Sequence, residues 1–195
     1  KPIIIYKEYR NKNVFGVNPT WEEYYATEKK IIPYLYSFAE KNNIRLHICP
    51  NTFDYDEENL FYSKLIKGKN WKLLKRLNND ISYQYLDESN VVVFITTAIG
   101  YEAISRGCKV AAFTTRSETT NIRSHKFGWP YSFNKKADDF WINYFDEKKF
   151  DEILNNLNQE SQQTYNQLIK RKYDFLLPFD PGNKILNKKL KNLKI

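Results

Sequence analysis

Two kinds of apolar spacing follow one another along the chain and predict alternating strands and helices. Short apolar or alternating runs, typical of strands, occupy residues 3–6, 44–49, 71–75, 91–95 and 109–114. The run over 91–95 is uniformly apolar, as buried parallel strands tend to be. Apolar residues three and four apart predict helices over residues 21–42, 56–68, 81–88 and 99–106. Pro33 predicts a kink or a restart in the first helix, and Gly107 is a natural C-cap for the last.

This alternation predicts the fold class. Strands that alternate with helices favour an α/β fold with a Rossmann-like, doubly wound parallel sheet covered on both faces. A chain of 195 residues suits one well-buried domain, which we expect to span residues 1–180. Residues 181–195 are expected to form a helical tail packed on that domain, because apolar residues recur there at near-helical spacing: Ile185, Leu186, Leu190 and Leu193.

The net charge of +8 raises the question of an acidic partner. Lysine and arginine neutralise phosphates, so a nucleic-acid-binding domain is one alternative. The lysines are dispersed, however, except over residues 184–194, and Lys, Asn, Ile, Tyr and Phe are abundant together, as an A/T-rich coding sequence would produce. This pattern favours a protein that does not bind nucleic acid. For the lysine-rich tail, contact with a membrane surface is a second option beside packing.

The sequence also bounds where the protein acts. No apolar run approaches the ~20 residues needed to span a bilayer, and the start lacks the zones of a signal peptide. We therefore expect a cytoplasmic protein, with peripheral contact at the inner face of the membrane as the second option. Because methionine is absent, even at position 1, we expect sequence before Lys1. Cys49 and Cys108 stand in apolar, strand-like surroundings and are predicted to be free thiols.

The segment after the strand over 91–95 combines groups that bind phosphate. Thr96 and Thr97 offer hydroxyls where a buried strand becomes a helix, and the first amides and the dipole of a helix attract anions. Gly100 would let a ligand approach the backbone closely. Glu102 lies at the edge of an apolar face, where a ribose diol would be a suitable partner. The alternative is that Thr97 only caps the helix and Glu102 pairs with a lysine.

The sequence around this junction resembles a known family. Residues 97–110, T-A-I-G-Y-E-A-I-S-R-G-C-K-V, look like the S-T-L-G-Y-E-A-L-A-R-G-x-K-V segment of bacterial surface-carbohydrate glycosyltransferases, which resemble the transferases of 3-deoxy-manno-octulosonic acid (Kdo). Two further segments agree, Lys126–Pro130 ahead of Phe140-Trp141 and Phe179–Asn183, and the resemblance covers roughly residues 81–187. Thr97 departs from the serine of the pattern but keeps a hydroxyl.

The resemblance implies a GT-B glycosyltransferase of lipopolysaccharide or capsule biosynthesis. This chain would be its C-terminal, donor-binding half and would bind a nucleotide-activated sugar, with CMP-Kdo favoured, for transfer to a glycan or glycolipid acceptor. Thr97, Gly100 and Glu102 would contact the donor phosphate and ribose. No residue here supplies the catalytic base, which is expected on a missing N-terminal domain. The helix start would stabilise the leaving phosphate, so we expect neither a metal ion nor a cofactor.

Basic loop residues complete the predicted donor site. Lys7 and Arg10 follow the first strand, and Arg116 and Arg123 follow the strand that ends near residue 114. The carboxyl ends of parallel strands meet at one edge of a sheet, where these side chains would hold a sugar carboxylate or phosphate; otherwise each is a solvated surface residue. Trp129 belongs either to a stacking wall beside the nucleotide or to a packed turn.

Asp138 and Asp139 are interpreted as N-terminal caps of a helix, and residues 180–183 as a turn. A nucleotide-binding module without transferase activity remains an alternative function. Donor turnover by the whole protein would exclude that module, whereas steeply salt-dependent oligonucleotide binding with indifference to CMP would indicate the nucleic-acid-binding domain.

Overall fold

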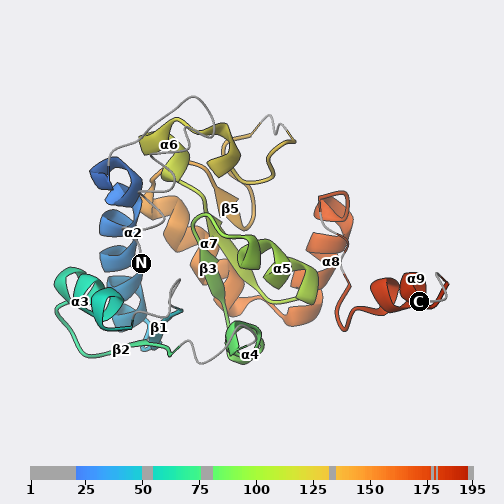
Figure 1. Ribbon diagram of the computed structural model, residues 1–195, viewed down its shortest axis with the longest axis horizontal. Helices are drawn as coiled ribbons and strands as arrows, with labels where there is room; N and C mark the ends of the chain where they lie inside the picture. Colours follow the sequence, from blue (N-terminus) through green and yellow to red (C-terminus); the bar gives the residue numbers. More distant parts are fainter. Residues whose placement is uncertain are drawn as a thin grey trace. The chain divides into compact units, whose positions relative to one another are not determined.

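The computed structural model describes residues 21–49, 55–75, 81–131, 135–176, 178 and 180–192 (Figure 1). The strand expected over residues 3–6, together with Lys7 and Arg10, lies outside the described residues. The chain folds into two compact units. The first holds the described residues up to Tyr85 together with Thr115–Ser124, and the second holds Leu86–Thr114 and the described residues from His125 onward. The domain boundary expected at residue 180 stays a prediction.

In the first unit, helices pack against two short parallel strands. Its elements are α2 (Trp21–Lys41), β1 (Leu46–Ile48), α3 (Tyr55–Leu65), β2 (Trp71–Leu73) and α6 (Arg116–Thr120). Strand β1 pairs with β2 in parallel, with Leu46 opposite Trp71. Four buried residues form the core between strands and helices: Ile32, Ile48, Ile66 and Leu73. Helix α2 continues through Pro33 without the restart expected there.

The second unit is built on three parallel strands. They lie in the order β3 (Val92–Phe94), β4 (Val110–Phe113) and β5 (Trp141–Ile142). Helix α5 (Ala98–Arg106) connects β3 to β4, and α4 (Ile81–Glu88) precedes β3 across the boundary between the units. The helices that follow β5 are α7 (Glu147–Gln159), α8 (Gln162–Tyr173) and α9 (Lys184–Asn192). As expected, Gly107 ends α5 in the left-handed conformation, with φ 86°.

Helices cover both faces of this sheet. Phe94 is in register with Ala112, and its ring lies 5.3 Å from that of Tyr101 on α5. Phe113 follows Ala112 in β4, and because side chains alternate along a strand, it points to the other face of the sheet. There its ring stacks on that of Phe150 of α7, with the ring centroids 4.1 Å apart. All four residues of β4 are buried. The expected α/β class, with parallel strands and helices between them, is therefore confirmed.

The structure contains one strand that the sequence pattern did not predict. Strand β5 has two residues and was not among the expected strands. The interpretation of the two aspartates before it as helix caps is wrong, because they precede a strand. Asp138 Oδ2 instead accepts a hydrogen bond from the Tyr173 hydroxyl at 3.0 Å, and Asp139 forms an ion pair with Lys172. These contacts fasten the start of β5 to the end of α8.

Tyr165 of α8 is expected to make the stability of the second unit fall at alkaline pH. Its ring is buried, and its hydroxyl accepts a hydrogen bond from the Val110 N–H at 3.1 Å. Burial raises the pKa of Tyr165 above its ordinary value of 10.0. A tyrosine pKa that is raised on folding adds stability that is fully present below the unfolded pKa and is lost as pH rises through the folded one.

We therefore expect the free energy of unfolding to fall as pH rises above 10.0, the ordinary pKa of tyrosine. Tyr165→Phe should cost about 1 kcal/mol at neutral pH, because it removes one hydrogen bond, and should show a shallower alkaline fall. Urea unfolding measured between neutral and alkaline pH checks both effects. Tyr144→Phe is the control at a half-buried tyrosine and should keep the slope of the parent. A parental slope in Tyr165→Phe would contradict the assignment.

Candidate functional site

The carboxyl ends of β4 and β5 are joined by hydrogen bonds at one edge of the sheet. Thr114 follows β4 and Asn143 follows β5, and the Thr114 hydroxyl donates to Asn143 Oδ1 at 2.6 Å. The N–H of Phe127 donates to the same oxygen at 2.8 Å, which fixes the orientation of the amide group. Asn143 Nδ2 makes no hydrogen bond to a described residue and is a donor available to a ligand. Ligands of parallel α/β sheets bind at this edge.

The segment Lys126–Pro130 is both a packed turn and an exposed surface. Phe127 is 1% exposed, and its ring stacks on those of Tyr101 and Trp141, with centroids 5.6 and 5.3 Å away. The Gly128 N–H donates to the Tyr101 hydroxyl at 3.0 Å. Burial raises the pKa of Tyr101 above its ordinary value. Trp129, by contrast, is 51% exposed. Phe127 therefore anchors the turn in the core, and Trp129 remains available for stacking.

Most of the family-like motif around α5 holds the scaffold together. The Arg106 guanidinium makes two hydrogen bonds to the Asp87 carboxylate, at 3.2 and 2.5 Å. Lys109 is buried, and its Nζ donates to the Leu157 carbonyl at 2.9 Å near the end of α7. The Ser105 hydroxyl donates to the Pro178 carbonyl at 2.7 Å. These side chains are used within the protein and are not candidates for a ligand.

Gly100 has a role in packing, and its expected role in the close approach of a ligand stays a prediction. Gly100 is buried, and a Cβ placed on it would lie 2.2 Å from Cγ of Phe94. Its own N–H donates to the Thr97 carbonyl at 3.2 Å. The missing side chain thus leaves room for the Phe94 ring on the sheet, whereas the expected benefit was close approach of a ligand to the backbone.

Thr97 and Glu102 remain candidates for donor binding, at the start of α5 and one turn into it. Thr97 directly precedes α5 in an extended conformation, is exposed and makes no side-chain cap hydrogen bond. Thr97 therefore occupies the N-cap position, as the alternative to donor binding predicted, but its side chain makes no cap hydrogen bond. Its hydroxyl lies beside the first amides of α5, which have no acceptor within a helix. Thr96 and Glu102 are half-buried on either side of this point.

The expected basic cluster is only partly described. Arg116 is 6% exposed, and its guanidinium forms an ion pair with Glu28 of α2 within the first unit. This pairing assigns Arg116 to the fold of that unit. Arg123 is exposed and begins the short helix η1 (Arg123–His125). A role in donor binding stays a prediction for Arg123, and Lys7 and Arg10 lie outside the described residues.

A family model described as "putative O-antigen biosynthesis protein" matches residues 4–194, which is nearly the whole chain. The chain belongs to this family. No curated protein and no solved structure matches it. The description of the family points to the biosynthesis of surface carbohydrate, the biological theme that the motif over residues 97–110 also implies.

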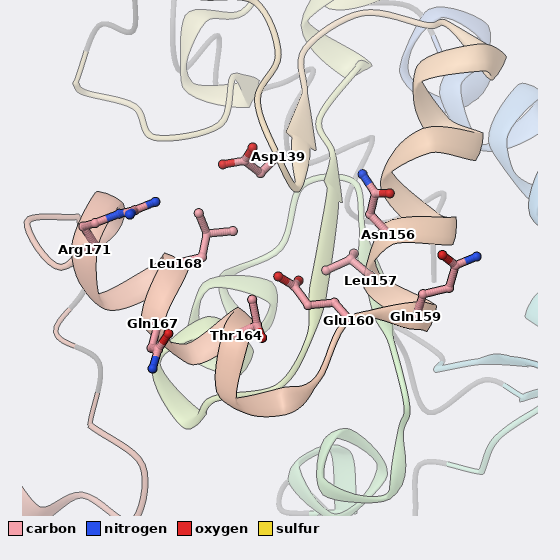
Figure 2. A pocket seen from close by; sticks show the side chains of 9 residues that line it. All are labelled: Asp139, Asn156, Leu157, Gln159, Glu160, Thr164, Gln167, Leu168 and Arg171. Atoms are coloured by element: carbon pink, nitrogen blue, oxygen red, sulfur yellow. The ribbon is translucent and has the colours of Figure 1, made fainter.

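The second unit has a pocket away from the strand ends just described. It has a volume of about 740 Å³ and lies between α7 and α8 (Figure 2). Its lining residues are Asp139, Asn156, Leu157, Gln159, Glu160, Thr164, Gln167, Leu168 and Arg171. Asp139 precedes β5, and the Glu160 carbonyl accepts a hydrogen bond from Lys109, which precedes β4. The pocket therefore lies toward the amino ends of the strands, and no expected site residue lines it.

Other expected features of the chain can be placed among the described residues. Cys49 and Cys108 are free thiols, but Cys49 is exposed and not packed as a small hydrophobic residue. Within the described ranges, no three His, Cys, Asp or Glu side chains are grouped to hold a metal ion. In the same part of the chain, no helix combines the length and the apolar character needed to cross a membrane.

Proposed function

We propose that this protein is a metal-independent glycosyltransferase of the GT-B type, and that the second unit binds the nucleotide of its activated sugar in a Rossmann-like manner. The observation that carries the proposal is Thr97. Its hydroxyl is exposed and uncommitted at the start of α5, in a motif whose other polar residues largely hold the scaffold. CMP-Kdo is the favoured donor because the motif resembles that of Kdo transferases, and a glycan or glycolipid is the acceptor.

The chemistry proposed for this edge is electrostatic. The first amides of α5 and the Thr97 hydroxyl bind the donor phosphate, and the positive end of the helix stabilises the charge that develops as the nucleotide leaves. Glu102, one turn into α5, accepts hydrogen bonds from the ribose hydroxyls. Trp129 stacks on the base, and Asn143 Nδ2 donates to the donor. The residue that takes the proton of the acceptor hydroxyl lies outside this set.

We expect Thr97→Val to weaken CMP binding by about 1 kcal/mol, roughly fivefold, because one hydrogen bond to the phosphate is lost. The melting temperature should stay at the parental value, since the Thr97 hydroxyl makes no cap bond. Calorimetric titration with CMP, beside a thermal melt without ligand, measures both. Thr97→Ser is the matched control: it keeps the hydroxyl, as the family pattern does, and should bind like the parent. Parental affinity in Thr97→Val would place the phosphate elsewhere.

The same titration tests whether the ribose hydroxyls contribute to binding, and a separate assay tests for transfer of the sugar. If Glu102 binds the ribose diol, the parent binds CMP more tightly than its 2′,3′-dideoxy analogue, and equal affinities would contradict that role. Titrating UDP, GDP and ADP in parallel identifies the nucleotide. Release of CMP from CMP-Kdo only when an acceptor glycan is present would establish transfer. Nucleotide binding without such release, in the whole protein, would favour a binding module without transferase activity.

A further inference from the structure

Helix α9 is a basic helix whose described side chains all face solvent. Its sequence, KILNKKLKN, has four lysines and no acidic residue. Ile185 is 45% exposed and Leu190 is 43% exposed, although burial would be favourable for both. The tail expected over residues 181–195 is thus helical over Lys184–Asn192, and its described apolar side chains remain accessible. Among the described residues, nothing covers this apolar surface.

Three of the four lysines of α9 project from a different side of the helix from Ile185 and Leu190. At 3.6 residues per turn, Ile185 and Leu190 project about 140° apart at the borders of one arc. Lys184, Lys188 and Lys191 project from the remaining surface, and Lys189 lies within the apolar arc, where its long stem can lie along apolar groups with the ammonium in water. A short helix with an apolar arc and a lysine-rich face is suited to the boundary between lipid headgroups and acyl chains.

The start of α9 is fastened to α5. The Asp180 carboxylate accepts hydrogen bonds from the Ile185 N–H at 2.9 and 3.0 Å, which caps the helix. The Asp180 N–H donates to the Ser105 carbonyl at 3.1 Å, and the Ser105 hydroxyl donates to Pro178. The turn at residues 180–183 is therefore confirmed as a structural element, with Gly182 and Asn183 at positive φ. It joins α9 to the helix that carries the proposed nucleotide site.

We propose that α9 binds the surface of a membrane that contains anionic lipids. Four lysines without a compensating acid complement negatively charged headgroups, and Ile185 and Leu190 enter the acyl boundary. A nucleic acid would satisfy the lysines but would leave the exposed apolar residues in water, so the lipid surface fits the whole helix better. This contact would hold the proposed nucleotide site near lipid-linked acceptors, and it is independent of which nucleotide that site binds.

Sedimentation of the protein with lipid vesicles tests the proposal. We expect binding to phosphatidylcholine vesicles that contain about 30% phosphatidylglycerol, weak binding to phosphatidylcholine alone, and loss of binding as salt is raised. Lys188→Glu with Lys191→Glu should lower the partition coefficient at least tenfold, since each lysine near an anionic surface contributes roughly fivefold. Ile185→Ser with Leu190→Ser, which keeps every charge, should also lower it severalfold.

A charge-matched control separates α9 from the net charge of the protein. Lys67→Glu with Lys72→Glu changes the charge by the same amount at two exposed lysines of the first unit and should leave vesicle binding within about twofold of the parent, because neither lysine lies on α9. Equal loss in this control would overturn the proposal, as would parental binding by Ile185→Ser with Leu190→Ser. Tighter binding to a single-stranded oligonucleotide than to the anionic vesicles would favour a nucleic acid instead. Circular dichroism of each variant confirms that the fold is retained.

Discussion

Gly100→Ala is expected to lower the free energy of unfolding by about 3 kcal/mol, the upper range for an overpacked core. A Cβ at this position would lie 2.2 to 2.6 Å from three atoms of the Phe94 ring. Phe94 is 4% exposed between the sheet and α5, so its ring has little room to withdraw. Chemical denaturation of the parent and the variant measures the loss.

Two controls define the cause of that loss. Gly182→Ala adds a methyl group where nothing lies within 4 Å, at φ 78°, and should cost only about 1 kcal/mol of backbone strain. Phe94→Leu in the Gly100→Ala background should be less destabilising than the sum of the two single changes, because the smaller side chain relieves the contact. If Gly100→Ala instead melted like the parent and lost nucleotide affinity, close approach of a ligand would be the correct reason for the glycine.

Glu28→Gln is expected to destabilise the first unit by about 3–5 kcal/mol, the usual cost of leaving one charge of a buried ion pair without its partner. The side chains of Arg116 and Glu28 are 7% and 12% exposed, so water cannot replace the lost carboxylate. Denaturant unfolding checks the loss. If Arg116 acts only in the fold, the affinity for CMP should stay at the parental value in molecules that remain folded.

An exposed ion pair provides the comparison. Asp87→Asn removes the carboxylate that pairs with Arg106, but these side chains are 55% and 33% exposed, respectively. Its cost should be at most about 1 kcal/mol, as for surface pairs in general. If Glu28→Gln and Asp87→Asn lowered the free energy of unfolding by similar amounts, burial would not be what makes the pair of Arg116 and Glu28 important for stability. A weaker affinity of Glu28→Gln for CMP, with unchanged stability, would restore Arg116 as a donor-binding residue.

Strands and helices could be predicted from the sequence where the residues of the element itself show apolar periodicity or a cap. The strands β1 to β4 and the helices α2 and α4 lie within the expected ranges, and α3 and α5 begin one residue before theirs. Apolar periodicity and caps such as Gly107 act over a few neighbouring residues, so a local sequence carries their signal. The two-residue strand β5 offered no such signal. Its place depends on pairing with β4 and on Asp138 and Tyr173, which are far apart in the sequence.

The functional interpretation of the motif needed the tertiary structure for the same reason. The sequence by itself determined the α/β class, the junction at Thr97 and the basic, apolar composition of α9, since each of these is a property of contiguous residues. It could not tell that Gly100 makes room for Phe94, or that Arg116 is buried against Glu28. A glycine or an arginine in a loop has the same sequence signal whether a ligand or the protein occupies the space beside it. Only the folded chain decides which, because that space is filled by side chains whose positions depend on long-range packing.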